Sequence, residues 1–391
     1  MQPTTDKKID YSKKFEGKVF VIITNTFKFM GGAERQALIL ADYLVSEIGA
    51  EVHFIAFEDG DKLKNIIEAI GCKWKYIPLN FYKSKFDKAY SYIKLVSYIN
   101  KIKGAVLIPY AAISNKVVGQ IFKKTNASFS FWNQRDEGRS LFNTKNEKKA
   151  LFNVSAIVSN SFEGRDFLVN QYNIPKHKIN VINNGIKSDF DNKNIDWHKK
   201  LNTDKQALIV SMIANVHSFK DHLTLLYAWR IVLSNYNDER PLILVLAGTL
   251  GPTVTKLKVL GFDLNLSQNL IFAGPVDDVR SLISASYMCV FSSNLEGCPN
   301  GVLECMEQGK VVIGTNISGV GQALGNKYEN QCLSEPNNAE DLASKIISLY
   351  EKPSLLVEIG QYNKQRINKE FSVKKMAEAH LELISQTFND N

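Results

Sequence analysis

The chain has 391 residues, 45% of them hydrophobic and 23% charged, which is typical of a globular protein with two domains of ordinary size. The sequence contains no apolar run of about 18 residues, so we expect no membrane-spanning helix, and its five scattered cysteines form no CxxC pair that would indicate a disulfide framework or a cysteine zinc site. The net charge of +8 is uneven, because residues 1–190 carry +11 and residues 191–391 carry −3. The basic first half predicts an anionic partner: phosphates, a membrane surface or nucleic acid.

The first 18 residues are polar, and the first apolar run, 18–24, has the length of a strand rather than that of a signal peptide. The odd number of cysteines favours a reducing compartment. We therefore expect a cytoplasmic protein.

Short runs of consecutive apolar residues, rich in Val and Ile, alternate with helical stretches along the chain. Such runs are typical of strands that are buried on both faces of a parallel sheet. They cover residues 18–24, 51–57, 105–110, 154–160, 207–214, 241–248, 270–274, 287–293 and 310–315. Their alternation with helical segments such as 33–48 and 221–236 predicts an α/β doubly wound architecture.

The strands are too many for one sheet, and the polar stretch 183–206 has the composition of a linker. We expect two Rossmann-like domains, residues 1–190 and 191–370, and a helix within 371–391 that packs back on the first domain. A single barrel is less favoured, because eight evenly spaced βα units are not visible. Doubly wound domains bind ligands at the carboxyl ends of their strands, so the loops that follow the strands should carry the chemistry.

The loop after the first strand contains Gly31 and Gly32 directly before a helix. Glycines let backbone amides approach a ligand closely, and the helix dipole favours a diphosphate there. The alternative is that the two glycines only form the turn.

The corresponding loop of the second half, 214–229, carries Asn215 and Lys220, with Asp221 placed to cap the next helix. A lysine at a helix entry can contact phosphate as a point charge, although an exposed surface lysine is the alternative. His217 and His222 lie five residues apart without a further ligand, so we predict no zinc site.

A third loop follows residues 270–274 and includes Gly274 and Val276. Its backbone groups could contact the edge of a base. An ordinary turn capped by Asp277 or Asp278 is the alternative.

The fourth loop, 293-SNLEGCPNGVLE-304, places Glu296 before a helix and Glu304 inside it. The helix is expected from about Pro299 to Gln308, because Pro suits the first helical position and Gly309 suits the end. Two carboxylates at this separation suit one elongated ligand with hydroxyl groups, such as a sugar or a ribose. The remaining contacts in this loop are expected from Gly297, Cys298, Pro299, Asn300, Gly301 and Val302. Two unrelated surface glutamates are the alternative.

These motifs, in this order, resemble a retaining glycosyltransferase of family 4 with the GT-B fold. The stretch 296-EGCPNGVLE-304 with 309-GKVVIGT-315 is similar to the Glu-x7-Glu region of that family. The loop GGAERQ, the segment 158–190 and the segments 246–251 and 272–286 extend the resemblance over most of the chain.

The resemblance implies two Rossmann-like domains that face each other across a cleft. The first would bind the acceptor and the second a nucleotide-diphospho-sugar, with UDP expected from the family's habits. Glu304 would hold the ribose, Glu296 would contact the sugar near the transferred carbon, and Lys220 would contact the diphosphate with the amides of Gly31 and Gly32. No metal and no other cofactor would be needed, and transfer would retain the anomeric configuration.

The sequence departs from the family pattern at three places. Asn215 stands where many relatives have an arginine, the stretch 130–140 has no histidine, and 316–324 lacks a glutamate. Arg135 or Arg139 is a candidate for the missing cation, and a salt-bridged loop is the alternative.

Lysines alternate with Tyr, Phe, Leu and Ile over residues 83–104 at helical spacing. This segment suits an anionic membrane surface, and so predicts an acceptor carried on a polyprenyl diphosphate and a location at the inner face of the membrane. An ordinary surface helix with its apolar face in the core is the alternative. Nucleic acid is not expected, because no recognised nucleic-acid module is present.

Three functions follow from these features, of which transfer of a hexose or N-acetylhexosamine to a growing glycan is favoured. A nucleotide-sugar epimerase shares the fold but not the Glu-x7-Glu pattern. A sugar-binding protein without catalysis is a third interpretation.

Overall fold

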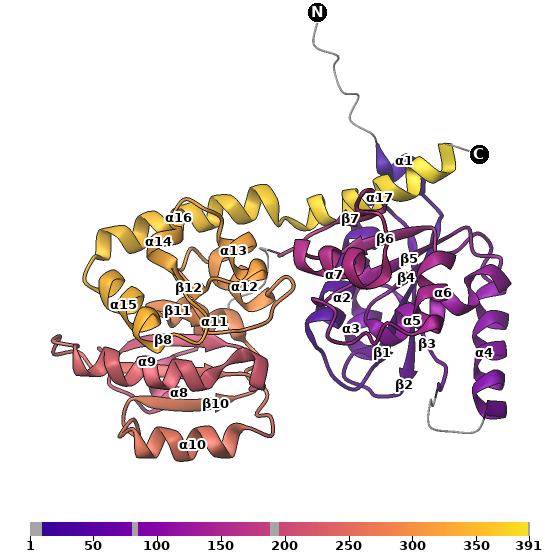
Figure 1. Ribbon diagram of the computed structural model, residues 1–391. Helices are drawn as coiled ribbons and strands as arrows, with labels where there is room; N and C mark the ends of the chain where they lie inside the picture. The colour runs from indigo at the N-terminus through magenta and orange to yellow at the C-terminus, as the bar shows by residue number, and fades with distance from the viewer. Residues whose placement is uncertain (1–9, 80–84, 188–194, 390–391) are drawn as a thin grey trace, which may run out of the picture. The chain divides into compact units, whose positions relative to one another are not determined.

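The computed structural model describes residues 10–79, 85–187 and 195–389. The chain divides into two compact units. The N-terminal unit comprises Met1–Gly185 and Val373–Asn391, and the C-terminal unit comprises Ile186–Ser372. Each unit has one parallel sheet with helices on both faces (Figure 1).

The sheet of the N-terminal unit has the strand order β3-β2-β1-β4-β5-β6-β7, and all its pairings are parallel. This is the doubly wound order, in which the chain starts in the middle of the sheet and reverses direction between β1 and β4. The strands are β1 (Val19–Thr26), β2 (Glu51–Glu58), β3 (Lys73–Tyr76), β4 (Val106–Pro109), β5 (Phe129–Gln134), β6 (Ala156–Ser159) and β7 (Ile179–Val181).

Two apolar layers cover this sheet. In β1, Phe20 and Ile22 pack on one face and Val21 and Ile23 on the other, because side chains alternate along a strand. The helices are α1 (Tyr11–Phe15), α2 (Gly32–Ser46), α3 (Lys64–Ala69), α4 (Lys85–Asn100), α5 (Ala112–Ile121), α6 (Lys145–Asn153), α7 (Phe162–Tyr172) and α17 (Val373–Asn389), with short 3-10 turns η1 (Phe122–Lys124) and η2 (Lys176–Lys178).

The C-terminal unit repeats this order as β10-β9-β8-β11-β12-β13. Its strands are β8 (Leu208–Ile213), β9 (Leu242–Ala247), β10 (Leu270–Gly274), β11 (Met288–Phe291), β12 (Val312–Thr315) and β13 (Leu333–Ser334). The helices are α8 (Trp197–Leu201), η3 (Ser218–Lys220), α9 (His222–Ser234), α10 (Val254–Asp263), α11 (Val279–Ala285), α12 (Asn300–Glu307), α13 (Ser318–Leu324), α14 (Glu329–Cys332), α15 (Ala339–Tyr350) and α16 (Pro353–Glu370). The predicted α/β doubly wound architecture is confirmed in both units.

The last helix, α17, belongs to the N-terminal unit. Its Met376, Ala377, Leu381 and Ile384 are buried in the same apolar cluster as Phe20 and Ile22. The chain leaves that unit after Gly185 and returns at Val373. The boundary predicted at 190/191 falls within 188–194, outside the described residues.

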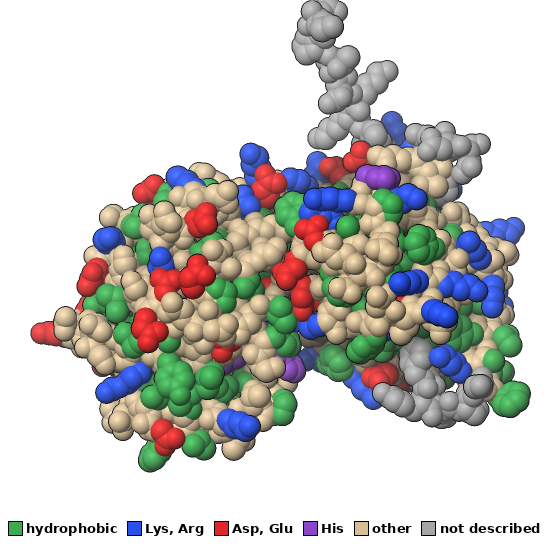
Figure 2. All heavy atoms as spheres, in the orientation of Figure 1, with side chains coloured by type: hydrophobic (Ala, Val, Ile, Leu, Met, Phe, Trp, Pro, Cys, Tyr) green, Lys and Arg blue, Asp and Glu red, His purple; other side chains and the backbone are tan. Residues whose placement is uncertain are grey.

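Charge differs between the two units. Figure 2 shows Lys and Arg side chains outnumbering Asp and Glu on the visible face of the N-terminal unit, whereas acidic side chains are frequent on the C-terminal unit. This agrees with the charges of +11 and −3 carried by the two halves of the sequence.

Candidate functional site

A lysine and a glutamate that are far apart in sequence meet at the carboxyl edge of the C-terminal sheet. Lys220 ends the turn η3 after β8, and Glu296 lies in the loop after β11. Strands β8 and β11 are neighbours in the sheet, so the loops that follow them lie side by side. Lys220 Nζ donates to Glu296 Oε1 in a charge-assisted hydrogen bond.

Glu296 is 6% exposed, and its two oxygens have different surroundings. Oε1 accepts from Lys220 Nζ and, at 2.8 Å, from Ser293 Oγ. Among the described residues, these are the contacts that the structure gives this carboxylate, and neither is made by Oε2. The arrangement fixes one oxygen and leaves the other for a ligand.

The loops that carry Lys220 and Glu296 are joined by hydrogen bonds. Ser292 Oγ lies 2.8 Å from the carbonyl oxygen of Asp221 and 3.1 Å from that of Lys220. The Asn294 amide donates to the Phe219 carbonyl at 2.8 Å. Behind them, Thr315 Oγ1 at the end of β12 donates to the carbonyl of Ser293. The site is therefore built by the ends of three adjacent strands.

Helix α12 begins directly after the glutamate loop, at Asn300, and ends at Glu307. The predicted helix is confirmed, with Pro299 one position earlier than expected, at the cap. Glu304 lies in its second turn and is half-buried. The side chain of Val302 is fully buried in the core, so any ligand contact at this position is left to its backbone.

Two glycines let other elements pack tightly against this loop. A Cβ on Gly319, in α13, would lie 2.4 Å from the carbonyl oxygen of Glu296 and 2.2 Å from that of Gly297. A Cβ on Gly301 would lie 2.5 Å from the carbonyl oxygen of Ile213. Cys298 lies between Gly297 and Gly301 in the loop and is half-buried. Gly319 was not among the site residues predicted from the sequence.

The other predicted loops of this unit lie at the same sheet edge. Asn215 Oδ1 accepts from the Thr249 amide at 2.9 Å, so Asn215 joins the loops after β8 and β9. Gly274 ends β10 with a positive φ of 68°, and its carbonyl accepts from Gly248. Val276 packs against the apolar cluster beneath β9.

Helix α9 presents its N-terminus beside Lys220. Asp221 caps it, because Oδ1 accepts from the Thr224 amide at 3.2 Å. His222, the first helical residue, is buried, and neither of its ring nitrogens has a hydrogen-bond partner among the described residues. Burial, with Lys220 and His217 nearby, lowers the pKa of His222 to about 4, so its ring is neutral at pH 7.

In the N-terminal unit, Arg135 follows β5 and is surrounded by residues at the ends of other strands. Its guanidinium donates to Asn184 Oδ1 and, at 3.3 Å, to Asn133 Oδ1, and it lies 5.1 Å from the centre of the Tyr110 ring. Asn160 Nδ2 donates to the Arg135 carbonyl at 3.2 Å. Tyr110, Asn160 and Asn184 follow β4, β6 and β7, so the sheet order brings them together around Arg135.

Buried polar atoms without a protein partner lie at the same edge of this sheet. Among the described residues they include Thr24 Oγ1, Asn25 Oδ1 and Asn160 Oδ1. An unpaired buried polar atom is costly, and a bound polar ligand can satisfy it. These residues were not predicted from the sequence, although each lies at or directly after the end of an apolar strand.

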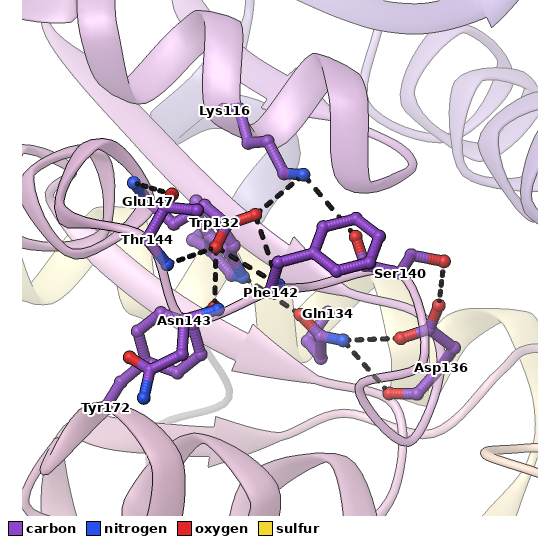
Figure 3. A network of polar contacts seen from close by, with 10 residues as sticks. All are labelled: Lys116, Trp132, Gln134, Asp136, Ser140, Phe142, Asn143, Thr144, Glu147 and Tyr172. Carbon is purple, nitrogen blue, oxygen red and sulfur yellow. Dashed lines mark hydrogen bonds and ion pairs between the residues drawn. The ribbon is translucent and has the colours of Figure 1, made fainter.

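The loop that carries Arg135 is fastened by a polar network (Figure 3). Asp136 Oδ1 accepts from Gln134 Nε2 at 2.6 Å, and Asp136 Oδ2 accepts from Ser140 Oγ at 2.7 Å. Lys116 Nζ, on α5, donates to the Ser140 carbonyl at 3.4 Å. The backbone around Arg135 is therefore held from both sides.

The same lysine connects this loop to a buried carboxylate. Lys116 Nζ lies 2.7 Å from Glu147 Oε1, while Glu147 Oε2 accepts from Tyr172 Oη at 2.9 Å and from the Thr144 amide at 2.8 Å (Figure 3). Burial opposes ionisation of Glu147, but Lys116, Thr144 and Tyr172 together lower its pKa to about 2. Glu147 thus remains charged and anchors the loop.

The predicted glycine loop of the N-terminal unit is a helix cap in this structure. The Gly31 amide donates to Glu34 Oε2 at 3.1 Å, and α2 begins at Gly32. Burial raises the pKa of the Glu34 carboxyl. Contact of a diphosphate with the Gly31 amide would therefore compete with this carboxylate.

Two further observations concern metals and membranes. The described residues contain no group of three or more His, Cys, Asp or Glu side chains placed to hold a metal ion. None of the helices in 10–79, 85–187 and 195–389 is long and apolar enough to cross a bilayer.

Two family models together match most of the chain. The family described as "Glycosyl transferases group 1" matches residues 193–366, and "Glycosyltransferase Family 4" matches residues 30–190. The chain belongs to glycosyltransferase family 4. The resemblance to family 4, stated from the sequence, is thereby confirmed, whereas retention of the anomeric configuration stays a prediction.

Curated glycosyltransferases match parts of this chain. The LpsE lipopolysaccharide core biosynthesis glycosyltransferase of Rhizobium meliloti is 30% identical over 129 residues, or 33% of this chain and 38% of the relative. The UDP-Gal:alpha-D-GlcNAc-diphosphoundecaprenol alpha-1,3-galactosyltransferase of Escherichia coli is 24% identical over 190 residues, or 47% and 48%. The matched segments thus span less than half of the relatives' own lengths.

Solved structures share the fold of this family member over almost its whole length. HepE from Anabaena in complex with UDP and glucose superposes with a TM-score of 0.80 at 17% identity, covering 94% of this chain and 99% of HepE. A glycosyltransferase from Rickettsia africae gives a TM-score of 0.80 at 22% identity, covering 96% and 100%. The two Rossmann-like units are thus those of the GT-B fold.

Proposed function

We propose that this family 4 protein transfers a hexose or N-acetylhexosamine from a nucleotide-diphospho-sugar to a lipid-linked saccharide. UDP is the expected nucleotide, transfer retains the anomeric configuration, and no metal is required. The observation that carries this proposal is the Lys220–Glu296–Ser293 arrangement at the carboxyl edge of the C-terminal sheet. It places a cation, a half-occupied carboxylate and a helix N-terminus together.

Lys220 is proposed to hold the diphosphate. An ammonium group has three donor hydrogens, so Nζ can keep its bond to Glu296 while it donates to a phosphate oxygen. The N-terminus of α9 adds partial positive charge next to Lys220. Together they would stabilise the negative charge that develops on the leaving diphosphate, which is the role that a metal fills in other enzymes.

Glu296 and Glu304 are proposed to bind the two ends of the donor. Glu296 Oε2 would accept from a sugar hydroxyl, and Glu304 would accept from the ribose hydroxyls. The carbon–oxygen bond to the diphosphate breaks, and the acceptor hydroxyl attacks the same face. Its proton passes to the departing phosphate oxygen, which lies on that face.

The acceptor is proposed to bind to the N-terminal unit. Thr24, Asn25 and Asn160 offer unsatisfied buried polar atoms for its hydroxyl groups, and Arg135 offers a cation. Two relatives are named as acting on undecaprenyl-diphosphate-linked sugars, which supports a lipid-linked acceptor and a location at the inner face of an anionic membrane. The contribution of Arg135 to catalysis stays a prediction.

The first test is a thermal-shift screen with UDP-, GDP-, ADP- and dTDP-sugars, each with and without EDTA. We expect stabilisation by one nucleotide class that EDTA does not change. Stabilisation that disappears with EDTA would contradict the metal-independent mechanism. No stabilisation by any donor would contradict the donor site.

The second test concerns Lys220. Lys220→Met should weaken binding of the selected nucleoside diphosphate by about tenfold or more, because a charge-assisted contact is lost, while binding of the nucleoside alone is unchanged. Isothermal titration calorimetry measures both. Lys256→Met, at an exposed position on α10, is the matched control and should change neither. An equal loss for nucleoside and nucleoside diphosphate would show that Lys220 does not contact phosphate.

The products distinguish this transferase from an epimerase. A transferase consumes the donor only when an acceptor is present, and proton NMR of the new linkage reports retention or inversion. Conversion of the nucleotide-sugar to its epimer without acceptor would replace the proposal.

A further inference from the structure

Helix α4 has two apolar faces, and the described part of the chain covers only the inner one. Leu95 and Ile99 on the inner face are buried against the sheet. Phe86, Tyr90 and Ile93 on the outer face are 86%, 59% and 65% exposed. Their spacing of four and three residues places them along one stripe of the helix. An ordinary surface helix has its apolar residues on the inner face alone.

The stripe continues into a groove of about 750 Å³ between α4 and the end of α5. Ala89, Ile93 and Val96 line it from α4, and Ile121 lines it from the other side. Lys101 and Lys124 also line the groove. An apolar depression with ammonium groups at its border suits a molecule with an apolar part and an anionic part.

Basic side chains accompany this outer face. Lys94 Nζ lies 4.5 Å from the centre of the Tyr90 ring, which keeps the ammonium group beside the apolar stripe. Lys101 and Lys124 are exposed. Figure 2 shows blue and green side chains together along the right-hand edge of the N-terminal unit, where Figure 1 places α4.

The charges on this face favour an anionic bilayer over a second copy of the chain as the binding partner. A second copy of the chain would bring its own lysines against these lysines, and like charges across an interface are repulsive. An anionic bilayer accepts both features at once, since its headgroups attract lysines and its interface accepts Phe, Tyr and Ile side chains.

We propose that the outer face of α4, formed by Phe86, Tyr90 and Ile93 with Lys94, Lys101 and Lys124, docks this protein on the surface of an anionic lipid bilayer. The helix lies in the plane of the interface without crossing it. This inference deepens the membrane location proposed above, and it can be tested without a sugar donor.

The test is co-sedimentation of the full chain with vesicles. Vesicles of phosphatidylglycerol and phosphatidylcholine in equal parts should bind the protein, pure phosphatidylcholine should bind it much less, and added salt should reduce binding. The triple variant Phe86→Ser, Tyr90→Ser, Ile93→Ser should bind at least about tenfold more weakly. The charge variant Lys94→Glu, Lys101→Glu should lose the preference for phosphatidylglycerol.

Phe262→Ser is the matched control, because Phe262 is 74% exposed on α10 of the C-terminal unit. It should bind vesicles like the unsubstituted protein. Equal binding to both vesicle types, or full binding by the triple variant, would overturn the proposal. So would a dimer in size-exclusion chromatography that the triple variant abolishes, since the face would then pair two copies. Thermal stabilisation by the donor should be the same in all variants, which separates failure here from failure of the proposed activity.

Discussion

Ser293 is the residue that fixes the orientation of Glu296. Its hydroxyl is fully buried and donates to the same oxygen that Lys220 contacts. Because Oε1 accepts two hydrogen bonds, the carboxylate cannot rotate freely, and Oε2 points in one fixed direction. Because the Ser293 hydroxyl donates to Glu296, we expect Ser293 to act as a positioning residue rather than to contact the substrate.

Ser293→Ala should therefore lower kcat by about tenfold with little change in KM, because a hydrogen bond to a charged group contributes about 1.5–3 kcal/mol. Steady-state kinetics with the donor found by thermal shift measures kcat and KM separately. Ser286→Ala is the control, since the Ser286 hydroxyl is also buried and donates to Ser211 Oγ at 2.9 Å. If both variants lose stability but keep kcat, Ser293 has only a structural role.

The sequence predicted Lys220 and Glu296 as separate ligand contacts, but not their ion pair. The two residues are 76 positions apart, and their contact depends on β8 lying next to β11 in the sheet. The pattern of apolar residues along the sequence predicts the strands, but not their order in the sheet. For the same reason the Arg135 cluster was missed, because Asn133, Asn160 and Asn184 come from different strand ends.

At the scale of elements, the nine apolar runs are confirmed as strands. The unpredicted strands β3, β5, β7 and β13 have weaker signals for physical reasons. In β3, Lys73-Trp-Lys-Tyr76 alternates lysine with aromatic residues, because it is an edge strand with one face toward solvent. Strand β5 buries polar side chains such as Asn133 and Gln134, and β7 and β13 have only three and two residues.

Helix α13 sets the position of the glutamate loop through Gly319. Gly319→Ala should push the backbone of Glu296 and Gly297 away by several tenths of an ångström or more, since the added Cβ would lie 2.2–2.4 Å from their carbonyl oxygens. We expect a lower Tm and loss of donor binding, measured by thermal shift and calorimetry. Misplacement of a binding group by about 1 Å is enough for a large loss of activity.

Gly321→Ala on the same helix is the matched control. Its added Cβ would have its nearest neighbour, Leu333 Cδ1, at 3.8 Å, which is an ordinary contact. This variant should keep donor binding and Tm. Equal behaviour of the two variants would show that helix propensity, rather than the contact with Glu296 and Gly297, determines the effect.

At the scale of the whole molecule, the two units repeat one architecture around different chemistry. Each sheet gathers its polar groups at its carboxyl edge: a lysine and a glutamate in one unit, and an arginine with several amides in the other. The doubly wound order was predictable from the alternation of strands and helices. Which polar residues meet at each edge could not be predicted from the sequence, because this depends on which strand ends are neighbours in the sheet.

Each unit also contains a buried histidine whose pKa is lowered to about 4: His222 in the C-terminal unit and His380 on α17 in the N-terminal unit. Burial lowers the pKa of His380 to about 4, the carbonyl of Met376 opposes this, and Arg135 adds to it. In the unfolded chain His380 takes up a proton near pH 6.5, whereas in the folded chain it does so only near pH 4. The stabilising contribution of His380 is therefore full above pH 6.5 and is lost as the pH falls toward 4.

His380→Gln should flatten this part of the pH dependence. The unsubstituted protein should lose on the order of 3 kcal/mol of unfolding free energy through this group between pH 6.5 and 4, at about 1.4 kcal/mol per pKa unit. The variant should be less stable at pH 7, but the difference should shrink as the pH falls. Urea unfolding at several pH values measures both proteins, and His177→Gln, at an exposed position, is the control. A difference between His380→Gln and the unsubstituted protein that stays constant from pH 7 to 4 would mean that His380 does not carry this dependence.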